Sequence, residues 1–445
     1  MLYFLFFLVL SIIFLVKRGY SEVVCLLLLF TMTISVFMMK MISVGMVYNI
    51  SNQFFPLFLD WFGILLVLLS FLVVVFSIIA GFSHVFKSAL NIYFNLMVII
   101  MLFLTLFFSV WNILLFFFMF EFVLLPMIFI IVLWGSQMER LMANYYFFLY
   151  TIIGGFPLLL SLIYLSMYGR AFYMSMVLGF GFDIGFIYMM GISLAFLCKL
   201  PIYSLHIWLP KAHVEAPVGG SMVLAGLLLK MGGYGVLRTC GLVFFIWGFG
   251  FYLFIGLLLL GMLYPLVICY RQSDVKSLIA YSSVGHMCVG VLGLLFFGIY
   301  GLKGAFIVFL GHGLISPGMF YIGNLIYERL GSRMILGMGG FEGKMKGFLF
   351  FLLLFFIGNM GYPPFISFFG ELCVYFSLLS YNFYFWLVLF LFVLVSGVVM
   401  FYYIAKLMKG GEGFKPMYYL NSRERFGLFG MMFFLMYMTP LMVFL

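Results

Sequence analysis

Apolar stretches long enough to cross a lipid bilayer occupy nearly the whole chain and constrain its fold more than any other feature. A bilayer core of about 30 Å needs about 20 apolar helical residues, and backbone groups at that depth must be paired within the protein. The sequence predicts fourteen spans, near 1–16, 20–39, 54–80, 89–109, 111–134, 145–168, 184–209, 219–241, 243–270, 276–299, 303–327, 348–381, 383–408 and 426–445. No connecting segment is long enough for a soluble domain, so we predict an all-α polytopic membrane protein.

Composition agrees with this prediction. The chain is 67% hydrophobic and 8% charged, whereas soluble domains are about 25% charged. The net charge of +10 comes without a basic run or an aromatic-basic stripe, so we expect no nucleic-acid partner. The six cysteines form no C-x-x-C pair. They predict neither a disulfide framework nor a metal or iron–sulfur site, and are expected to be small buried apolar residues.

The basic residues predict the topology. Sixteen Lys and Arg residues fall in odd-numbered loops and four (Lys40, Arg170, Arg238, Lys303) in even-numbered loops. Basic loops stay on the side from which a membrane protein is inserted. Both termini are therefore expected on the side opposite the basic loops. The apolar start, Met1 to Val16, precedes Lys17 and Arg18 and does not have the pattern of a secretory signal or a transit peptide.

Two spans are predicted to be interrupted. Pro201 follows Lys199-Leu200 in the seventh span, and the segment Gly358–Glu371 of the twelfth contains Pro363-Pro364. Proline removes a backbone donor and disfavours helix at the residue before it. Each site could be an ordinary proline kink. Corresponding interruptions five spans apart instead favour two inverted five-helix repeats, each with a discontinuous helix, as in transporters.

This reading divides the chain into four parts. They are an N-terminal three-helix segment (1–88), a first repeat of spans 4–8 (89–242), a second repeat of spans 9–13 (243–408), and a C-terminal loop with the last span (409–445).

Four ionisable residues fall inside spans: Glu121, Lys199, Lys230 and Glu371. Glu121 lies about ten residues into its span, roughly 15 Å deep, and a charge at the bilayer centre costs about 2.5–3.5 kcal/mol or more. They could form buried ion pairs that only hold helices together. Intramembrane ionisable groups more often mark proton relays or ion pathways.

The histidines extend this set. His286 and His312 are embedded in the tenth and eleventh spans, where they could relay protons or serve as hydrogen-bonded core residues. His206, Lys211, His213 and Glu215 follow the seventh span on the basic side and form a possible proton entrance.

Several of these residues lie in motifs that resemble a known family. The motifs are Glu121 with Trp134–Arg140, Cys198–Pro217, Leu227–Gly235, Asp274–Ser283 and Gly311-His312-Gly313. Together they resemble the antiporter-like membrane subunits of respiratory complex I over nearly the whole chain. Among these sister subunits the chain is most similar to the chain 4 family, because Glu371 stands where relatives often place a lysine.

The resemblance implies a proton-translocating subunit of NADH:ubiquinone oxidoreductase. Glu121 would pair with Lys199 and control the protonation of Lys230. A polar axis would run through Lys199, Lys230, His286 or His312, and Glu371, with Lys230 holding the proton and Glu371 passing it on.

The same resemblance implies partners and location. Neighbours would be the antiporter-like chains 2 and 5 and a lipid such as cardiolipin, in the mitochondrial inner membrane. The basic loops would face the matrix and both termini the intermembrane space. NADH, FMN, iron–sulfur clusters and ubiquinone would be held by partner subunits, because this sequence has no dinucleotide-binding, phosphate-loop or zinc motif. No cofactor is expected in this chain.

Two other functions remain open from the sequence. One is a cation/proton antiporter subunit of the multi-subunit sodium type, and the other is a structural membrane scaffold in which the buried charges only fix assembly.

Overall fold

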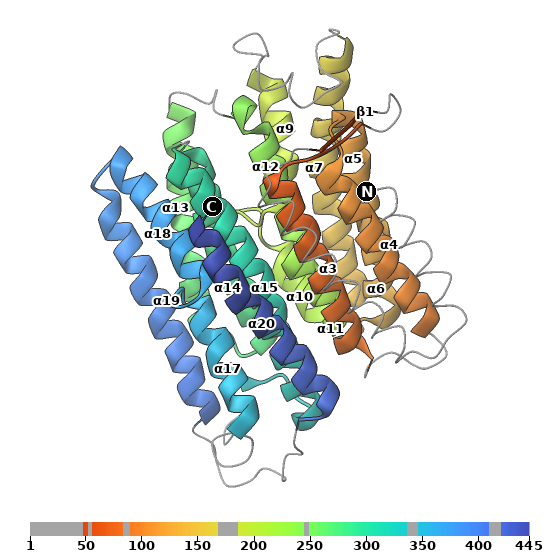
Figure 1. Cartoon of the computed structure of the whole chain (residues 1–445), viewed down its shortest axis with the longest axis vertical. Helices are drawn as coiled ribbons and strands as arrows, with labels where there is room; N and C mark the ends of the chain where they lie inside the picture. Colours follow the sequence, from red (N-terminus) through yellow and green to blue (C-terminus); the bar gives the residue numbers. More distant parts are fainter. Residues whose placement is uncertain are drawn as a thin grey trace.

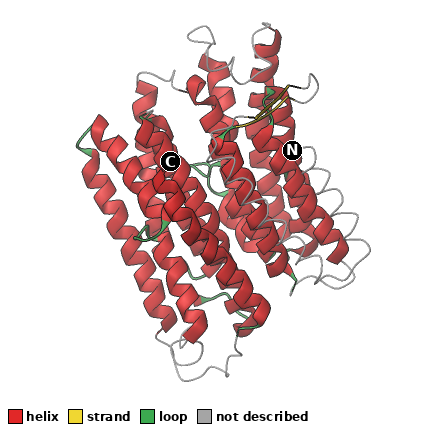
Figure 2. Cartoon of the chain, in the orientation of Figure 1, coloured by secondary structure: helices red, strands yellow, loops and turns green. Residues whose placement is uncertain are grey.

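A computed structural model describes residues 48–51, 56–82, 90–167, 186–243, 249–296, 298–335, 346–408 and 420–444. These residues are helical apart from one short hairpin and the connecting loops and turns (Figure 2). The hairpin pairs β1 (Tyr48–Ser51) antiparallel with β2 (Pro56–Leu59). The first group of helices comprises α3 (Trp61–Gly81), α4 (Leu90–Ser109), α5 (Ile113–Phe122), α6 (Leu124–Trp134), α7 (Arg140–Met167), α9 (Phe186–Lys199), α10 (Trp208–Glu215), α11 (Val218–Val223), the π-helical turn η2 (Leu224–Leu228) and α12 (Leu229–Val243). The second group comprises α13 (Phe249–Tyr270), α14 (Val275–Leu295), α15 (Ile299–Leu330), α17 (Lys346–Asn359), α18 (Ile366–Tyr381), α19 (Phe385–Met408) and α20 (Ser422–Phe444).

Nine helical segments of the described residues are long and apolar enough to cross a membrane, which confirms the multi-pass prediction. The predicted spans near 1–16 and 20–39 lie outside the described residues. The third span was predicted to begin near residue 54, and this start was wrong. Pro56–Leu59 form β2, and α3 begins at Trp61. The Asp60 side chain accepts a hydrogen bond from the Gly63 amide at 3.1 Å and so fixes the helix start.

The two groups of helices lie side by side (Figure 1). Helices α11, η2 and α12 of the first group pack against α15 of the second, and α20 packs against both α3 and α15. Helices α3, α14 and α15 are almost wholly buried within the described residues, whereas fewer than half of the residues in the membrane-spanning parts of α7, α13 and α19 are buried. The centre of the fold is therefore the seam between the groups. The boundaries between the predicted repeats stay a prediction.

Both predicted interruptions are present, and in each a side chain bonds across the break. Helix α9 ends at Lys199 and α10 begins at Trp208, whose indole Nε1 donates to the Cys198 carbonyl at 3.0 Å. Helix α17 ends at Asn359, and the Ser367 hydroxyl on α18 donates to the Gly358 carbonyl at 2.7 Å. These donors compensate carbonyls that a broken helix leaves without a backbone partner. Irregular backbone at membrane depth is tolerated only when it is buried or lines a wet cavity.

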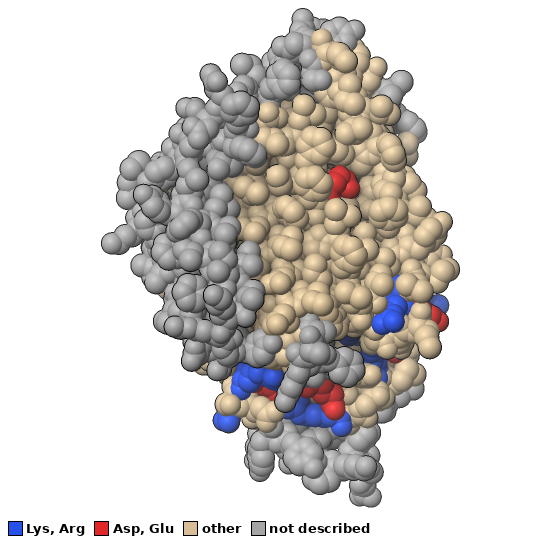
Figure 3. Space-filling view, turned by 90° about the vertical axis from the view of Figure 1, so that its right-hand side faces the viewer, with Lys and Arg blue, Asp and Glu red and all other residues tan. Residues whose placement is uncertain are grey.

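The outer face of the first group is apolar. In Figure 3 an acidic group stands within a wide field of other residues, while the visible Lys and Arg, with further acidic groups beside them, lie toward the lower end. Large side chains point outward along it, including Phe129, Phe156 and Leu160. An apolar face of this height suits lipid tails or neighbouring membrane helices.

Close contact between α12 and the end of α9 depends on Gly232. A Cβ there would lie 2.9 Å from the Phe196 carbonyl oxygen and 3.0 Å from the Leu200 amide nitrogen, both backbone atoms that cannot rotate away. We expect Gly232→Ala to push α12 from α9 and lower stability by about 1–3 kcal/mol, the usual range for overpacking. The measurement is the amount and thermal stability of the assembled protein in membranes. Gly256→Ala on α13 is the matched control, since nothing lies within 4 Å of its Cβ position. Equal behaviour of the two variants would contradict the packing argument.

Candidate functional site

Lys230 lies at the seam between the two groups of helices and is almost fully buried. Its Nζ donates to the Ala225 carbonyl at 2.6 Å and lies 2.8 Å from His312 Nδ1 on α15. A lysine in an apolar interior is stable only with such partners. This contact therefore joins the first group of helices to the second through a titratable pair.

The partner carbonyl is exposed by a local change of helix type. In η2 the Leu229 amide donates to the Leu224 carbonyl. In an α-helix the same amide would donate to the Ala225 carbonyl. The Ala225 oxygen is then available to the Lys230 ammonium. The sequence did not predict this turn, although π-helical turns inside α-helices occur frequently at functional sites.

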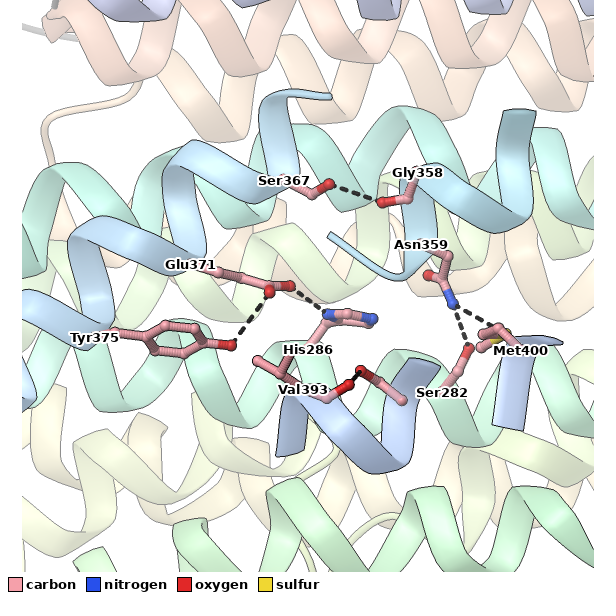
Figure 4. Close-up of polar contacts among 10 residues, drawn as sticks. Ser282, His286, Gly358, Asn359, Ser367, Glu371, Tyr375, Val393 and Met400 are labelled. Carbon is pink, nitrogen blue, oxygen red and sulfur yellow. Dashed lines mark hydrogen bonds and ion pairs between the residues drawn. The ribbon is translucent and has the colours of Figure 1, made fainter. Parts of the chain in front are cut away.

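The polar contacts continue from His312 into the second group. The His312 and His286 ring centroids are 5.9 Å apart, and His286 Nδ1 lies 3.1 Å from Glu371 Oε1. On the far side of the carboxylate, the Tyr375 hydroxyl donates to Oε2 at 3.2 Å (Figure 4). Glu371 thus lies between an imidazole and a phenol, with its side chain only 5% exposed.

The turn between α17 and α18 closes over this carboxylate. Gly361 has a φ of 70°, and a Cβ there would lie 2.6 Å from Glu371 Oε2. Nearby, the Asn359 amide donates to the Ser282 hydroxyl oxygen at 3.3 Å and approaches Met400 Sδ at 3.9 Å (Figure 4). The interrupted helix therefore brings polar groups to the level of Glu371.

The Lys199 ammonium has a different partner from the Glu121 carboxylate that the family resemblance implies. Its Nζ donates to the Phe120 carbonyl at 2.7 Å and lies 3.1 Å from the centre of the Phe120 ring. Phe120 is in the last turn of α5, where carbonyls have no intrahelical partner. The implied Glu121–Lys199 ion pair is not formed within 4.0 Å in this structure, because the ammonium is bound to the neighbouring carbonyl instead.

Glu121 faces a cavity of about 140 Å³ on the outer side of the first group. The walls are apolar and come from α5 and α7: Phe117, Ile152, Gly155, Phe156 and Leu159. The absence of a Cβ at Gly155 makes room, since a Cβ would lie 2.8 Å from Glu121 Oε1. That oxygen is buried and accepts no hydrogen bond within the described residues.

The four residues of the possible entrance do not form one cluster. Lys211 and Glu215 line a cavity of about 510 Å³ together with Glu139, Gln272, Ser277 and Tyr281. His213 is instead fully buried and stacks on Phe320 with ring centroids 4.6 Å apart. His206 stacks on Tyr203 at 5.4 Å.

Sequence reasoning missed several groups in this site. Tyr375, Asn359, Ser282 and the Phe120 and Ala225 carbonyls all contact or adjoin the predicted residues. Only Tyr375 had a signal in the sequence, because it follows Glu371 by four residues and so shares its helix face. Among the described residues, no group of three or more His, Cys, Asp or Glu side chains could hold a metal ion.

Comparisons with known proteins place this geometry in a family. The family model described as NADH:quinone oxidoreductase/Mrp antiporter, TM, matches residues 111–398. The chain is 37% identical over 402 residues to NADH-ubiquinone oxidoreductase chain 4 of Branchiostoma floridae, covering 86% of each chain. It is 38% identical over 318 residues to the Ceratitis capitata chain 4, covering 71% of each.

Solved structures share the fold. A chain of respiratory complex I from Thermus thermophilus matches with a TM-score of 0.84 at 22% identity, covering 97% of this chain and 94% of that one. A chain of the archaeal membrane-bound sulfane sulfur reductase matches with a TM-score of 0.85 at 20% identity, covering 98% and 94%. From the sequence relatives and the family match, the chain belongs to the NADH-ubiquinone oxidoreductase chain 4 family, the antiporter-like membrane subunits that translocate protons as part of respiratory complex I.

Proposed function

We propose that protons cross this subunit through Lys230, His312, His286 and Glu371. The observation that carries the proposal is their spacing, with contacts of 2.8 Å and 3.1 Å at the two ends and 5.9 Å between the imidazole centroids. All four side chains are buried in a chain that is 8% charged. Titratable groups at membrane depth are expensive, so a contiguous set of them indicates a proton route.

Each contact suits one step of transfer. The Lys230 ammonium donates toward His312 Nδ1, and a neutral imidazole accepts a proton at one nitrogen and can release one from the other. No direct hydrogen bond joins His312 to His286, so this step needs one water molecule or a ring rotation. His286 then delivers the proton to Glu371, where the Tyr375 hydroxyl stabilises the carboxylate.

Glu121 and Lys199 control the charge on Lys230 from the first group of helices. Lys199 is held at the Phe120 carbonyl and ring, next to the Glu121 residue in sequence. Movement of the ammonium toward the Glu121 carboxylate would change its separation from Lys230. Repulsion between like charges varies with distance and is strong in a low dielectric, so this movement alters the affinity of Lys230 for a proton.

Protons enter from the side of the basic loops. The 510 Å³ cavity supports this, because its lining includes the carboxylates of Glu139 and Glu215 and the ammonium of Lys211. His213, which stacks on Phe320, and His206, which stacks on Tyr203, are the histidines that would carry protons from this cavity toward the central residues.

The subunit works with redox centres held elsewhere in the complex. We propose that NADH, FMN, iron–sulfur clusters and ubiquinone bind to partner subunits, and that the antiporter-like chains 2 and 5 and cardiolipin lie against this chain. The buried Glu121 carboxylate beside an outward-opening cavity supports a protein neighbour there, since lipid tails cannot solvate it. The relatives named as NADH-ubiquinone oxidoreductase chain 4 support a mitochondrial inner-membrane location, with the basic loops toward the matrix.

Replacement of Lys230 tests the route directly. Lys230→Met keeps an unbranched side chain one atom shorter than lysine but removes the proton carrier, so the number of protons pumped per NADH oxidised should fall by the whole contribution of this subunit. The measurement is that ratio in vesicles containing the assembled complex. Lys303→Met is the matched control, because Lys303 is an exposed lysine at the start of α15. A fully assembled Lys230→Met complex with an unchanged ratio would favour the scaffold function.

The Gly361 contact provides a second test, of the Glu371 step. Gly361→Ala places a methyl group 2.6 Å from the Glu371 carboxylate position and should displace it from His286, lowering the proton ratio. Gly331→Ala is the control, since Gly331 also has a φ of 70° but nothing lies near its Cβ position. Both variants bear a similar left-handed backbone cost, of about 1–2 kcal/mol. Equal proton ratios for the two would refute the positioning of Glu371 by Gly361.

A further inference from the structure

A second polar cluster lies on the same helix as Lys230 and takes no part in the proposed route. Lys230, Tyr234 and Arg238 follow one another at intervals of four residues and so share one face of α12. The Arg238 guanidinium donates to Asp60 Oδ1 at 2.7 Å and to the Tyr234 hydroxyl. We call Asp60, Tyr234 and Arg238 the Arg238 cluster. It lies at the end of α12 away from the 510 Å³ cavity, beside the start of α3.

The hydrogen bonds of this cluster have a direction. The Tyr234 hydroxyl donates its own proton to the Phe108 carbonyl at 3.1 Å and accepts a bond from Arg238. Arginine has five N–H donors, no acceptor, and a charge that proteins do not remove. A proton arriving at Tyr234 from the side of Lys230 therefore finds no acceptor on Arg238 to which it could be passed.

Aromatic packing around Tyr234 leaves little room for water. The Tyr234 ring packs edge-on against Phe108 and Phe107, with centroids 5.3 Å and 5.9 Å away, and lies 6.3 Å from Phe116. All four rings are buried, with at most 2% of each residue exposed. Arg238 itself lies over the Tyr234 ring, 4.8 Å from its centre. A fixed arginine charge is one of the electrostatic barriers by which membrane pores exclude protons.

We propose that the Arg238 cluster is a barrier to protons at the end of α12 that lies beside the start of α3, away from the 510 Å³ cavity. Protons held at Lys230 can then leave only toward His312, across the seam. The inference rests on the proposed role of Lys230 as the proton carrier. It assigns Arg238 the role of a positioning residue, which acts on the path of the proton and does not itself transfer one.

The alternative is a purely structural role, in which the cluster acts as a clamp that only holds α3 against α12. Asp60 fixes the start of α3 and pairs with Arg238, so loss of either partner would break such a clamp. The two roles differ in what each partner contributes. A clamp needs both residues, whereas a barrier needs the positive charge and is preserved, or strengthened, when Asp60 loses its negative charge.

The test compares passive proton conductance of vesicles that contain the assembled, inhibitor-blocked complex. Arg238→Gln removes the cation and should raise the conductance several-fold and lower the number of protons pumped per NADH. Arg238→Lys keeps the positive charge, so vesicles with this variant should keep the low proton conductance of the unchanged complex. Vesicles with Asp60→Asn should do the same. The double variant Arg238→Gln with Lys230→Met should return to background conductance, because the leaking protons pass through Lys230.

Each outcome decides the proposal. The barrier proposal would be overturned by unchanged proton conductance in Arg238→Gln vesicles. It would also be overturned if Asp60→Asn vesicles conducted protons as well as Arg238→Gln vesicles. Should Arg238→Gln fail to assemble, the Asp60→Asn variant still decides, since a leak there contradicts the proposal and a tight membrane supports it. Failure of the proposed route itself is seen separately, as unchanged pumping in the Lys230→Met variant alone.

Discussion

The contact between Lys230 and His312 is the interaction on which the arrangement of the two groups of helices depends. An ammonium in an apolar interior must be paired or hydrogen-bonded, and here its partners come from both sides of the seam, Ala225 and His312. The helices must therefore approach closely. A Cβ at Gly313 would lie 2.7 Å from Leu69 Cδ2 and 3.3 Å from both Lys230 Cε and the Gly226 carbonyl oxygen, so that glycine permits the close approach of α15 to the helices that carry these residues. The burial of α15 and of the segment containing η2 follows from the same requirement.

Much of this structure could be predicted from residue type and position. Span lengths follow from hydrophobic runs, and Pro201 and Pro363-Pro364 marked the two interruptions that the structure confirms. Four intramembrane charges in so apolar a chain identified Lys230 and Glu371 as site candidates, and the structure brings both into one series with the two histidines. These features are predictable because unpaired backbone groups and ionisable side chains at membrane depth each carry a large free-energy cost. Only burial within the protein or a polar partner offsets that cost.

The remaining features depend on the competition between nearly equal alternatives. Leu224–Leu228 have the composition of an ordinary α-helix, and the π-helical turn is favoured only once Ala225 has the Lys230 ammonium as a partner. Lys199 can pair with the Glu121 carboxylate or bind the Phe120 carbonyl, one residue away, and sequence spacing does not distinguish them. The strand at Pro56–Leu59 is apolar like the helix that follows it, and only pairing with Tyr48–Ser51 separates the two.

The two groups of helices use the same backbone device for different chemistry. Each interrupted helix is closed by a donor that reaches back over the break, Trp208 in one and Ser367 in the other. Beside the first break lies a lysine bound to a carbonyl, and beside the second a carboxylate bound to an imidazole. A cation at one end and an anion at the other bias a mobile proton in the same direction, away from Lys199 and toward Glu371. In the proposed route, the repeated fold thus supplies the positions, and the charge held at each interruption determines where along the route a proton is bound most strongly.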